Sequence, residues 1–342
     1  MKIVPINEAY ERVFKRREGI PRLEVHAAGG CAHIGKISPA CLACFVPDEF
    51  HVNMTPCSDP YTAYCNANCI YCTDDRAARQ PLVVEEPKFM DEGSLQDWED
   101  ELVAGYNFQK QIIPILSFSG AGEPILQPKI LEEVIGFYKE RIEPAIGVPV
   151  WVKIYTNGIA FDKKMAKWCK KVGFDEIRFH LGATNFSDQV YENIEMTSRY
   201  IDTVAIETPS WPPHRAKLFE MLGKAEELGI KHVNMGQIEL TETNKFTISQ
   251  AYPEAEIFQV GSWVLDDGGL VYDLMREVAE RDYSYSILDC SGFVKQVQRG
   301  GIPTNRAVNI TYDGIGLKGM IDWELYDKKK KALKLTLERN SG

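Results

Sequence analysis

Short apolar runs alternate with amphipathic segments through the middle of the chain. Runs rich in β-branched and aromatic residues predict buried strands, and the segments between them carry apolar positions at the helical period. The predicted strands are 114–118, 148–155, 176–181, a strand that begins at 203–206, and 231–240, and the predicted helices are 129–141, 163–172 and 216–228. One more strand just before or around 65–72 brings the total to about six β/α units.

This alternation predicts an α/β fold with a parallel sheet and helices outside it. The strands are apolar along most of their length, which agrees with burial on both faces. The regular repetition favours a TIM-like barrel over an open sheet. In such barrels the chemistry lies at the carboxyl ends of the strands, and the turns that follow the predicted strands hold the informative residues.

The flanking segments differ from this core, so we expect three parts. Residues 1–58 form an N-terminal Cys-rich extension, 59–250 the barrel, and 251–342 a C-terminal α+β cap that is a candidate substrate or cofactor region. In the cap, the pattern predicts a helix at 269–281, a strand at 283–288, a β-rich stretch at 308–320 and a solvated basic helix end at 328–331.

The composition is that of an ordinary soluble globular chain. The 342 residues are 44% hydrophobic and 26% charged, with a net charge of −10. An acidic chain repels phosphate backbones, so nucleic-acid binding is disfavoured. The sequence shows neither a signal peptide nor a run long enough to span a membrane, and we expect a cytoplasmic protein. Its nine cysteines then suit metal ligation better than disulfides.

The most informative feature is the stretch from Cys65 to Cys72. Cys65, Cys69 and Cys72 have the spacing C-x3-C-x2-C, with Tyr71 before the last cysteine. Three close thiolates suit a cubane 4Fe–4S cluster that receives three protein ligands and leaves one iron open. A ferredoxin run, a zinc ribbon or a redox pair would show other spacings, while three unrelated buried cysteines are the alternative without function.

On these residues the chain resembles the radical S-adenosylmethionine (radical SAM) superfamily. The resemblance covers roughly residues 50–250 and implies a partial (β/α)6 TIM-like barrel. It also implies that the open iron binds the amino and carboxylate groups of SAM, and that one electron cleaves the sulfonium to give a 5′-deoxyadenosyl radical. Tyr71, the aromatic residue of the motif, is assigned to the cofactor pocket.

Two strand ends carry candidate residues for binding SAM. Gly120, Gly122 and Glu123 follow the strand at 114–118, and the segment resembles the superfamily's Gly-Gly-Glu-Pro motif, with Ala121 in place of a glycine. Glycines let the backbone approach a ligand, and a carboxylate accepts hydrogen bonds from an ammonium group. Thr156 closes the next strand in a Thr-Asn-Gly segment, which is otherwise an ordinary turn.

Three later residues are weaker candidates for the same pocket. His180 ends the strand at 176–181, and a satisfied core histidine is the alternative. Glu207 follows the next strand, where a salt bridge at the rim is the alternative. Ile238 lies where relatives hold the adenine with backbone groups, so its side chain says little.

A second group of cysteines precedes the motif. Four thiolates suit zinc, a single iron or an auxiliary iron–sulfur cluster, and structural cysteines without a metal are the alternative. Family members with auxiliary clusters carry them in C-terminal domains, so the order of segments departs from theirs. The four residues are Cys31, Cys41, Cys44 and Cys57.

The sequence thus predicts a radical SAM enzyme that abstracts hydrogen from a peptide, a protein or a small metabolite. Narrower versions are a glycyl-radical-enzyme activase and a cobalamin-dependent methylase. The electron donor would be a flavodoxin or ferredoxin, and an open iron requires anaerobic handling. The alternative of another class is a non-catalytic zinc or iron–sulfur protein that uses the same cysteines without SAM.

Overall fold

The structure is a computed structural model that describes most of the chain, with gaps. The described residues are 1–26, 31–45, 51–54, 65–73, 96, 99–100, 102–103, 106, 114–119, 122–259, 263–294, 308–312 and 317–321. For residues 26, 43–45, 51–54, 308–312 and 317–321 it describes the backbone alone.

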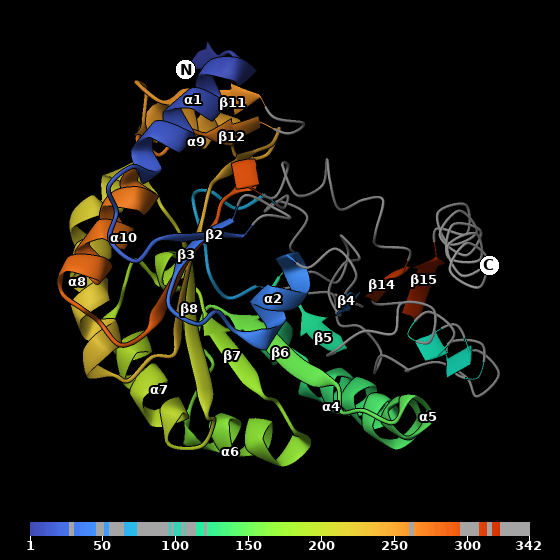
Figure 1. Ribbon diagram of the computed structural model, residues 1–342. Coiled ribbons are helices and arrows are strands. Elements are labelled where there is room, and N and C mark those ends of the chain that lie inside the picture. Colours follow the sequence, from blue (N-terminus) through green and yellow to red (C-terminus); the bar gives the residue numbers. More distant parts are fainter. Residues whose placement is uncertain are drawn as a thin grey trace, which may run out of the picture.

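A nine-stranded sheet forms the body of the described chain (Figure 1). Its order is β2-β3-β13-β9-β8-β7-β6-β5-β4, and every neighbouring pair from β13 to β4 is parallel. Because β2 and β4 are its edges in the described residues, the barrel is partial, and the predicted α/β fold is confirmed. The parallel strands are β4 (His51–Met54), β5 (Ile115–Phe118), β6 (Trp151–Thr156), β7 (Glu176–Phe179), β8 (Thr203–Pro209), β9 (His232–Gly236) and β13 (Ser286–Cys290).

The sheet also extends beyond the segment predicted to form the barrel. The strand predicted at 283–288 is β13, which pairs in parallel with β9 and is the seventh parallel strand, not part of a separate cap. On its other side β13 pairs antiparallel with β3 (Cys31–Ile34), which pairs with β2 (Glu24–His26). Both flanking segments therefore contribute strands to one sheet.

The single strand predicted at 231–240 is wrong in its second half. β9 ends at Gly236, whose carbonyl accepts the backbone N–H of Ser210 at 2.8 Å. The side chain of Gln237 then bonds the Leu265 carbonyl at 2.6 Å and the Phe293 N–H at 3.0 Å, which turns the chain away. Residues Glu239–Leu240 form β10 in a different sheet.

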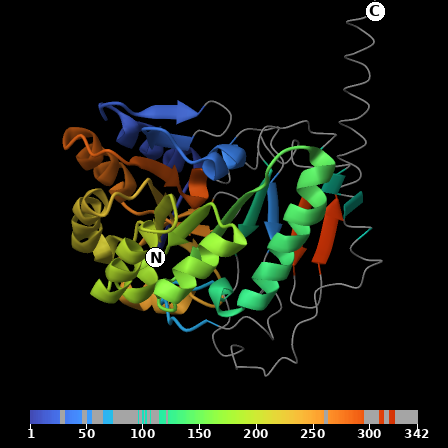
Figure 2. The same cartoon turned by 90° about the horizontal axis from the view of Figure 1, so that it is seen from below.

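This smaller sheet joins the two ends of the described chain. Its order is β1-β11-β12-β10, from β1 (Lys2–Val4), β11 (Glu256–Gln259) and β12 (Trp263–Leu265). A two-stranded hairpin, β14 (Val308–Tyr312) and β15 (Leu317–Ile321), pairs separately, and β14 lies against the β4 edge (Figure 2). The β-rich stretch predicted at 308–320 is thus confirmed.

Helices cover the outer side of the sheet, while α2 lies on the inner side (Figure 1). The helix predicted at 163–172 is confirmed residue for residue, because Asp162 caps Met165 N–H at its start and Gly173 ends it with φ +98°. The helices are α1 (Ile6–Arg17), α2 (Pro39–Phe45), α4 (Pro128–Phe137), α5 (Glu143–Ile146), α6 (Lys163–Val172), α7 (Asp188–Ser198), α8 (Arg215–Glu227), α9 (Lys245–Ala251) and α10 (Leu270–Glu280). In the described residues no helix is both long and apolar enough to cross a bilayer.

The inner face of the sheet is buried but polar. Val152 and Ile154 of β6 belong to the apolar core under the helices, while Lys153 between them faces the opposite side and is 1% exposed. On β7, Glu176 and Arg178 are likewise buried on the inner side. The expectation of burial on both faces therefore holds, but only one of the two faces is apolar.

Arg178 connects this inner face to α2. Its guanidinium donates to Glu176 Oε1 at 2.6 Å and to Glu207 Oε2 at 2.8 Å. It also donates to Ser38 Oγ at 3.0 Å and Cys41 Sγ at 3.1 Å, which belong to the start of the α2 segment. Helix α2 therefore closes part of the barrel interior through a buried ion-pair network.

Candidate functional site

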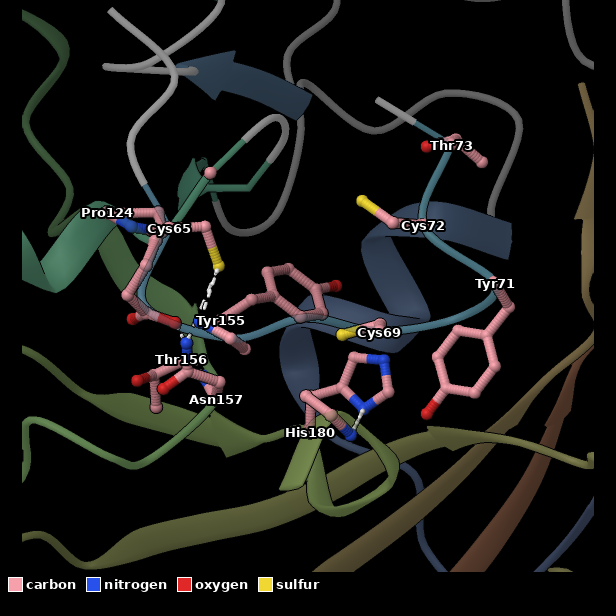
Figure 3. Close-up of a pocket in the computed structure, with 14 residues that line it drawn as sticks. Cys65, Cys69, Tyr71, Cys72, Thr73, Pro124, Tyr155, Thr156, Asn157 and His180 are labelled. Atoms are coloured by element: carbon pink, nitrogen blue, oxygen red, sulfur yellow. Dashed lines mark hydrogen bonds between the residues drawn. The ribbon is translucent and has the colours of Figure 1, made fainter. Parts of the chain in front are cut away.

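One cavity of about 240 Å³ lies at the carboxyl ends of the parallel strands (Figure 3). It brings together eight of the residues that the sequence singled out, from segments far apart in the chain. The lining comprises Cys65, Ala67, Cys69, Tyr71, Cys72, Thr73, Gly122, Glu123, Pro124, Tyr155, Thr156, Asn157, His180 and Ala183.

The three motif cysteines stand around the wall of this cavity (Figure 3). The loop is held locally, since Cys72 N–H donates to Cys69 O at 3.2 Å and Ala67 N–H donates to Cys65 Sγ at 3.4 Å. A single ion needs its ligands within about 2.3 Å of one point, and in the described part of the chain no three such side chains converge in that way. Three separated thiols fit the corners of a cubane better.

Glu123 supplies an open acceptor in the same cavity. Its Oε2 accepts the Asn157 backbone N–H at 2.7 Å, whereas its buried Oε1 has no hydrogen-bond partner among the described residues. Burial raises the pKa of Glu123 to about 7, against the opposing effects of the Asn157 N–H and the Thr156 hydroxyl. A buried carboxylate with a spare oxygen is stabilised when a cationic N–H donor binds it.

Thr156 shapes the turn in which these contacts are made. It lines the cavity, and its Oγ1 accepts the Gly158 N–H at 3.0 Å. A Cβ at Gly158 would lie 2.8 Å from atoms of both Phe179 and Val190, and φ there is +77°. Glycine is therefore required for this tight turn against the core.

Asn157 is a functional candidate that the sequence analysis missed. It lines the cavity, and its side-chain Nδ2 lies 3.7 Å from Cys65 Sγ and 2.7 Å from Asn66 Oδ1. The one signal that could have found it is its position beside Thr156 at a strand end. An Asn-Gly pair is so common in turns that this signal is weak.

His180 is present as a neutral imidazole. Burial lowers its pKa to about 4, although the charge of Glu207 opposes this shift. Its Nδ1 accepts the Ala183 N–H at 3.3 Å, so the ring proton resides on Nε2. The ring is nearly parallel to that of Tyr71, with centroids 5.8 Å apart.

Tyr71 is tightly enclosed beside His180. It is 8% exposed, and its Oη has no hydrogen-bond partner among the described residues. A Cβ at Gly182 would lie 2.3 Å from this oxygen and 2.8 Å from Thr208 Oγ1. The backbone of the turn after β7 thus approaches the cysteine loop as closely as a glycine permits.

The other predicted pocket residues lie apart from the cavity lining. Glu207 accepts hydrogen bonds through Oε2 from Arg178 and, at 3.2 Å, from Asn234. Ile238 is 4% exposed and packs in a small apolar cluster with Tyr71 and Trp211. Gly122 lines the cavity, while Gly120 lies outside the described residues.

The second cysteine group is only partly described. Cys31 Sγ lies 3.5 Å from the carbonyl of Asp289, and burial raises the pKa of this thiol. Cys41 receives the Arg178 hydrogen bond and lies 3.6 Å from Asn234 Oδ1, and burial raises its pKa as well. The side chain of Cys44 and all of Cys57 lie outside the described residues, so a second metal site stays a prediction.

Fold and cavity together define a parallel α/β partial barrel with a cluster-type cysteine loop at its mouth. A sequence profile described as the Radical SAM superfamily matches residues 60–236, just over half of the chain. The chain belongs to this superfamily, whose members are enzymes that use a 4Fe–4S cluster and SAM. No curated protein matches the chain.

Solved structures share the fold. SuiB of Streptococcus suis bound to S-adenosylmethionine has a TM-score of 0.51 and 13% identity, covering 78% of this chain and 59% of that one. SuiB bound to the precursor peptide SuiA has a TM-score of 0.45 and 11% identity, with coverages of 70% and 48%. Native anSMEcpe with bound AdoMet and Cp18Cys peptide has a TM-score of 0.41 and 15% identity, with coverages of 54% and 50%. The chain thus spans about half to six-tenths of the length of these proteins.

Proposed function

We propose that this chain cleaves SAM reductively, with a 4Fe–4S cluster held by Cys65, Cys69 and Cys72, and that it takes a hydrogen atom from a substrate. The observation that carries the proposal is the shared cavity. Three thiols from one loop and the spare carboxylate oxygen of Glu123 line the same 240 Å³. When bound, the cluster and SAM supply the one-electron cleavage that yields a deoxyadenosyl radical.

The residues of the chain bind and orient these groups. The three thiolates anchor three corners of the cluster, and Glu123 Oε1 accepts a hydrogen bond from the ammonium group of SAM. The Asn157 N–H holds Oε2, so the carboxylate cannot rotate freely. With a pKa near 7, Glu123 gives up its proton readily when a cation arrives.

His180 and Tyr71 keep one side of the cavity neutral and enclosed. A histidine with a pKa near 4 is uncharged at neutral pH, so it does not repel a sulfonium cation. The two rings are buried side by side and restrict water on that side. Exclusion of water protects a reactive radical from stray hydrogen donors.

The substrate class stays broad within this proposal. A peptide, a protein and a small metabolite all suit it, with a flavodoxin or ferredoxin as electron donor. Activation of a glycyl-radical enzyme and methylation with cobalamin are narrower hypotheses, and none of the described residues favours either. SuiB was solved with its precursor peptide, but that structural likeness is too weak to choose a substrate for this chain.

Reconstitution with iron and sulfide under nitrogen tests the proposal. We expect a reduced EPR signal that changes when SAM is added, with release of 5′-deoxyadenosine. Cys69→Ala should abolish deoxyadenosine formation, whereas Cys169→Ala should retain it, because Cys169 is a buried thiol in α6 far from the motif in sequence. Circular dichroism checks that both variants fold.

Two results would count against the proposal. The first is wild-type protein whose cluster spectrum ignores SAM, which is the behaviour of a non-catalytic metalloprotein. The second is retained SAM cleavage in Cys69→Ala, which would remove Cys69 from the ligand set.

A further inference from the structure

Asn157 joins the cysteine loop to the loop of Glu123. Its side-chain Nδ2 contacts Cys65 Sγ at 3.7 Å and Asn66 Oδ1 at 2.7 Å. Its backbone N–H contacts Glu123 Oε2 at 2.7 Å. One residue, 4% exposed at the end of β6, therefore touches a proposed cluster ligand and the proposed acceptor of the SAM amine.

The orientation of the Asn157 amide is fixed by its other contact. The Ile159 backbone N–H donates to Asn157 Oδ1 at 2.9 Å. Because a backbone N–H is a donor only, the carbonyl side of the amide must face Ile159. The NH₂ side then faces Cys65, so the group beside the sulfur is a hydrogen-bond donor.

The turn that carries Asn157 is rigid. Asn193 Nδ2 donates to the Gly158 carbonyl at 2.9 Å, and Gly158 packs against Phe179 and Val190 with no room for a Cβ. The donor is therefore held in place by α7 and by the core, independently of the cysteine loop. A preorganised donor contributes more to a bound charge than one that must be ordered.

From this arrangement we infer that Asn157 is a positioning residue that raises the reduction potential of the cluster held by Cys65, Cys69 and Cys72. The inference rests on the proposed function. Hydrogen bonds to cluster sulfurs and nearby charge set the potential of iron–sulfur clusters. A donor beside a thiolate stabilises the reduced state, which carries the additional negative charge.

Asn157→Asp tests the inference at constant side-chain shape. The variant keeps an oxygen toward Ile159 but replaces the donor with a carboxylate beside Cys65. In an EPR-monitored redox titration, we expect the reduced-to-oxidised ratio at a fixed potential to fall about tenfold, equivalent to about 59 mV for one electron. Asn157→Ala, which removes the donor without adding charge, should give a smaller fall in the same direction.

A matched control makes the same chemical change elsewhere. Asn7→Asp converts an exposed amide of α1 to a carboxylate and should leave the potential at the wild-type value. A second readout measures the coupling between loops, because loss of the Asn157–Cys65 and Asn157–Asn66 contacts should speed iron release to a chelator about tenfold in Asn157→Ala. This rate needs no turnover.

The outcomes separate the two proposals. Wild-type protein without a SAM-responsive cluster overturns the proposed function itself. A wild-type cluster that responds to SAM, together with wild-type potential and wild-type iron release in both Asn157 variants, overturns the role of Asn157. A folded Asn157 variant that loses its cluster during reconstitution supports the coupling, provided that Asn7→Asp retains it.

Discussion

Replacing Arg178 by methionine is the sharpest test of how the barrel interior is held together. Arg178 is 2% exposed and bridges Glu176, Glu207 and the α2 segment. Methionine retains most of the apolar stem but leaves Glu176, which is 0% exposed, without its cation. Removing one partner of a buried ion pair costs about 3–5 kcal/mol, so we expect a loss of this size in the free energy of unfolding.

The pH dependence of the variant gives the reasoning a second, independent sign. In the native chain burial opposes ionisation of Glu176, but Arg178 and Lys153 outweigh it and lower its pKa, so this contribution to stability is present above the ordinary carboxyl pKa and lost as pH falls below it. Without Arg178, burial raises the pKa of Glu176. The native state then binds a proton that the unfolded chain does not, and the variant should regain stability as pH falls from 7 toward the ordinary pKa of a glutamate, about 4.3.

Urea unfolding followed by tryptophan fluorescence measures both effects. The double variant Glu176→Gln/Arg178→Met should recover at least about 2 kcal/mol of the loss, because no uncompensated buried charge remains on Glu176. Arg199→Met is the control, since Arg199 pairs with Glu195 at an exposed position and should cost no more than about 1 kcal/mol. A single variant no less stable than this control, or one that weakens as pH falls toward 5, would refute the reasoning.

Two further predictions concern the cavity. SAM affinity measured by equilibrium dialysis should fall about tenfold per pH unit below the Glu123 pKa of about 7, because the ammonium group needs the ionised carboxylate; Glu123→Gln should bind SAM more weakly and lose this dependence, and a wild-type profile in that variant would exclude Glu123 as the acceptor. Gly182→Ala places a Cβ 2.3 Å from Tyr71 Oη and should cost about 1–3 kcal/mol of stability and reduce iron loading, whereas Gly136→Ala, with open space in α4, should be neutral or stabilising by up to about 1 kcal/mol; equal effects in the two would contradict the close approach at Gly182.

Local signals in the sequence were sufficient for the parts of the fold that depend on neighbouring residues. The helix from Lys163 to Val172 has a capping aspartate before it and a glycine after it, so its bounds could be predicted. The cysteine motif is likewise contained within eight residues. Both features are decided by chemistry that a short window contains.

Features that depend on distant partners could not be predicted in the same way. β13 joins the parallel sheet through β9, about 50 residues earlier in the chain, and its own sequence carries no sign of that partner. The break after Gly236 depends on contacts of Gln237 with Leu265 and Phe293. The role of Asn157 is of the same kind, since its partner Cys65 lies far away in sequence and the Asn-Gly pair alone indicates only a turn.

The buried charges of the barrel interior also bear on the charge that a ligand meets at its mouth. Arg178 is paired with two carboxylates, so little of its positive charge acts on the cavity next to it. His180, which lies between this network and the cavity, is neutral. Glu123 and any ionised thiolates of the motif therefore dominate the potential there, and a sulfonium cation enters an environment of opposite sign. The ion pairs beneath the site thus keep uncompensated positive charge away from a cationic cofactor.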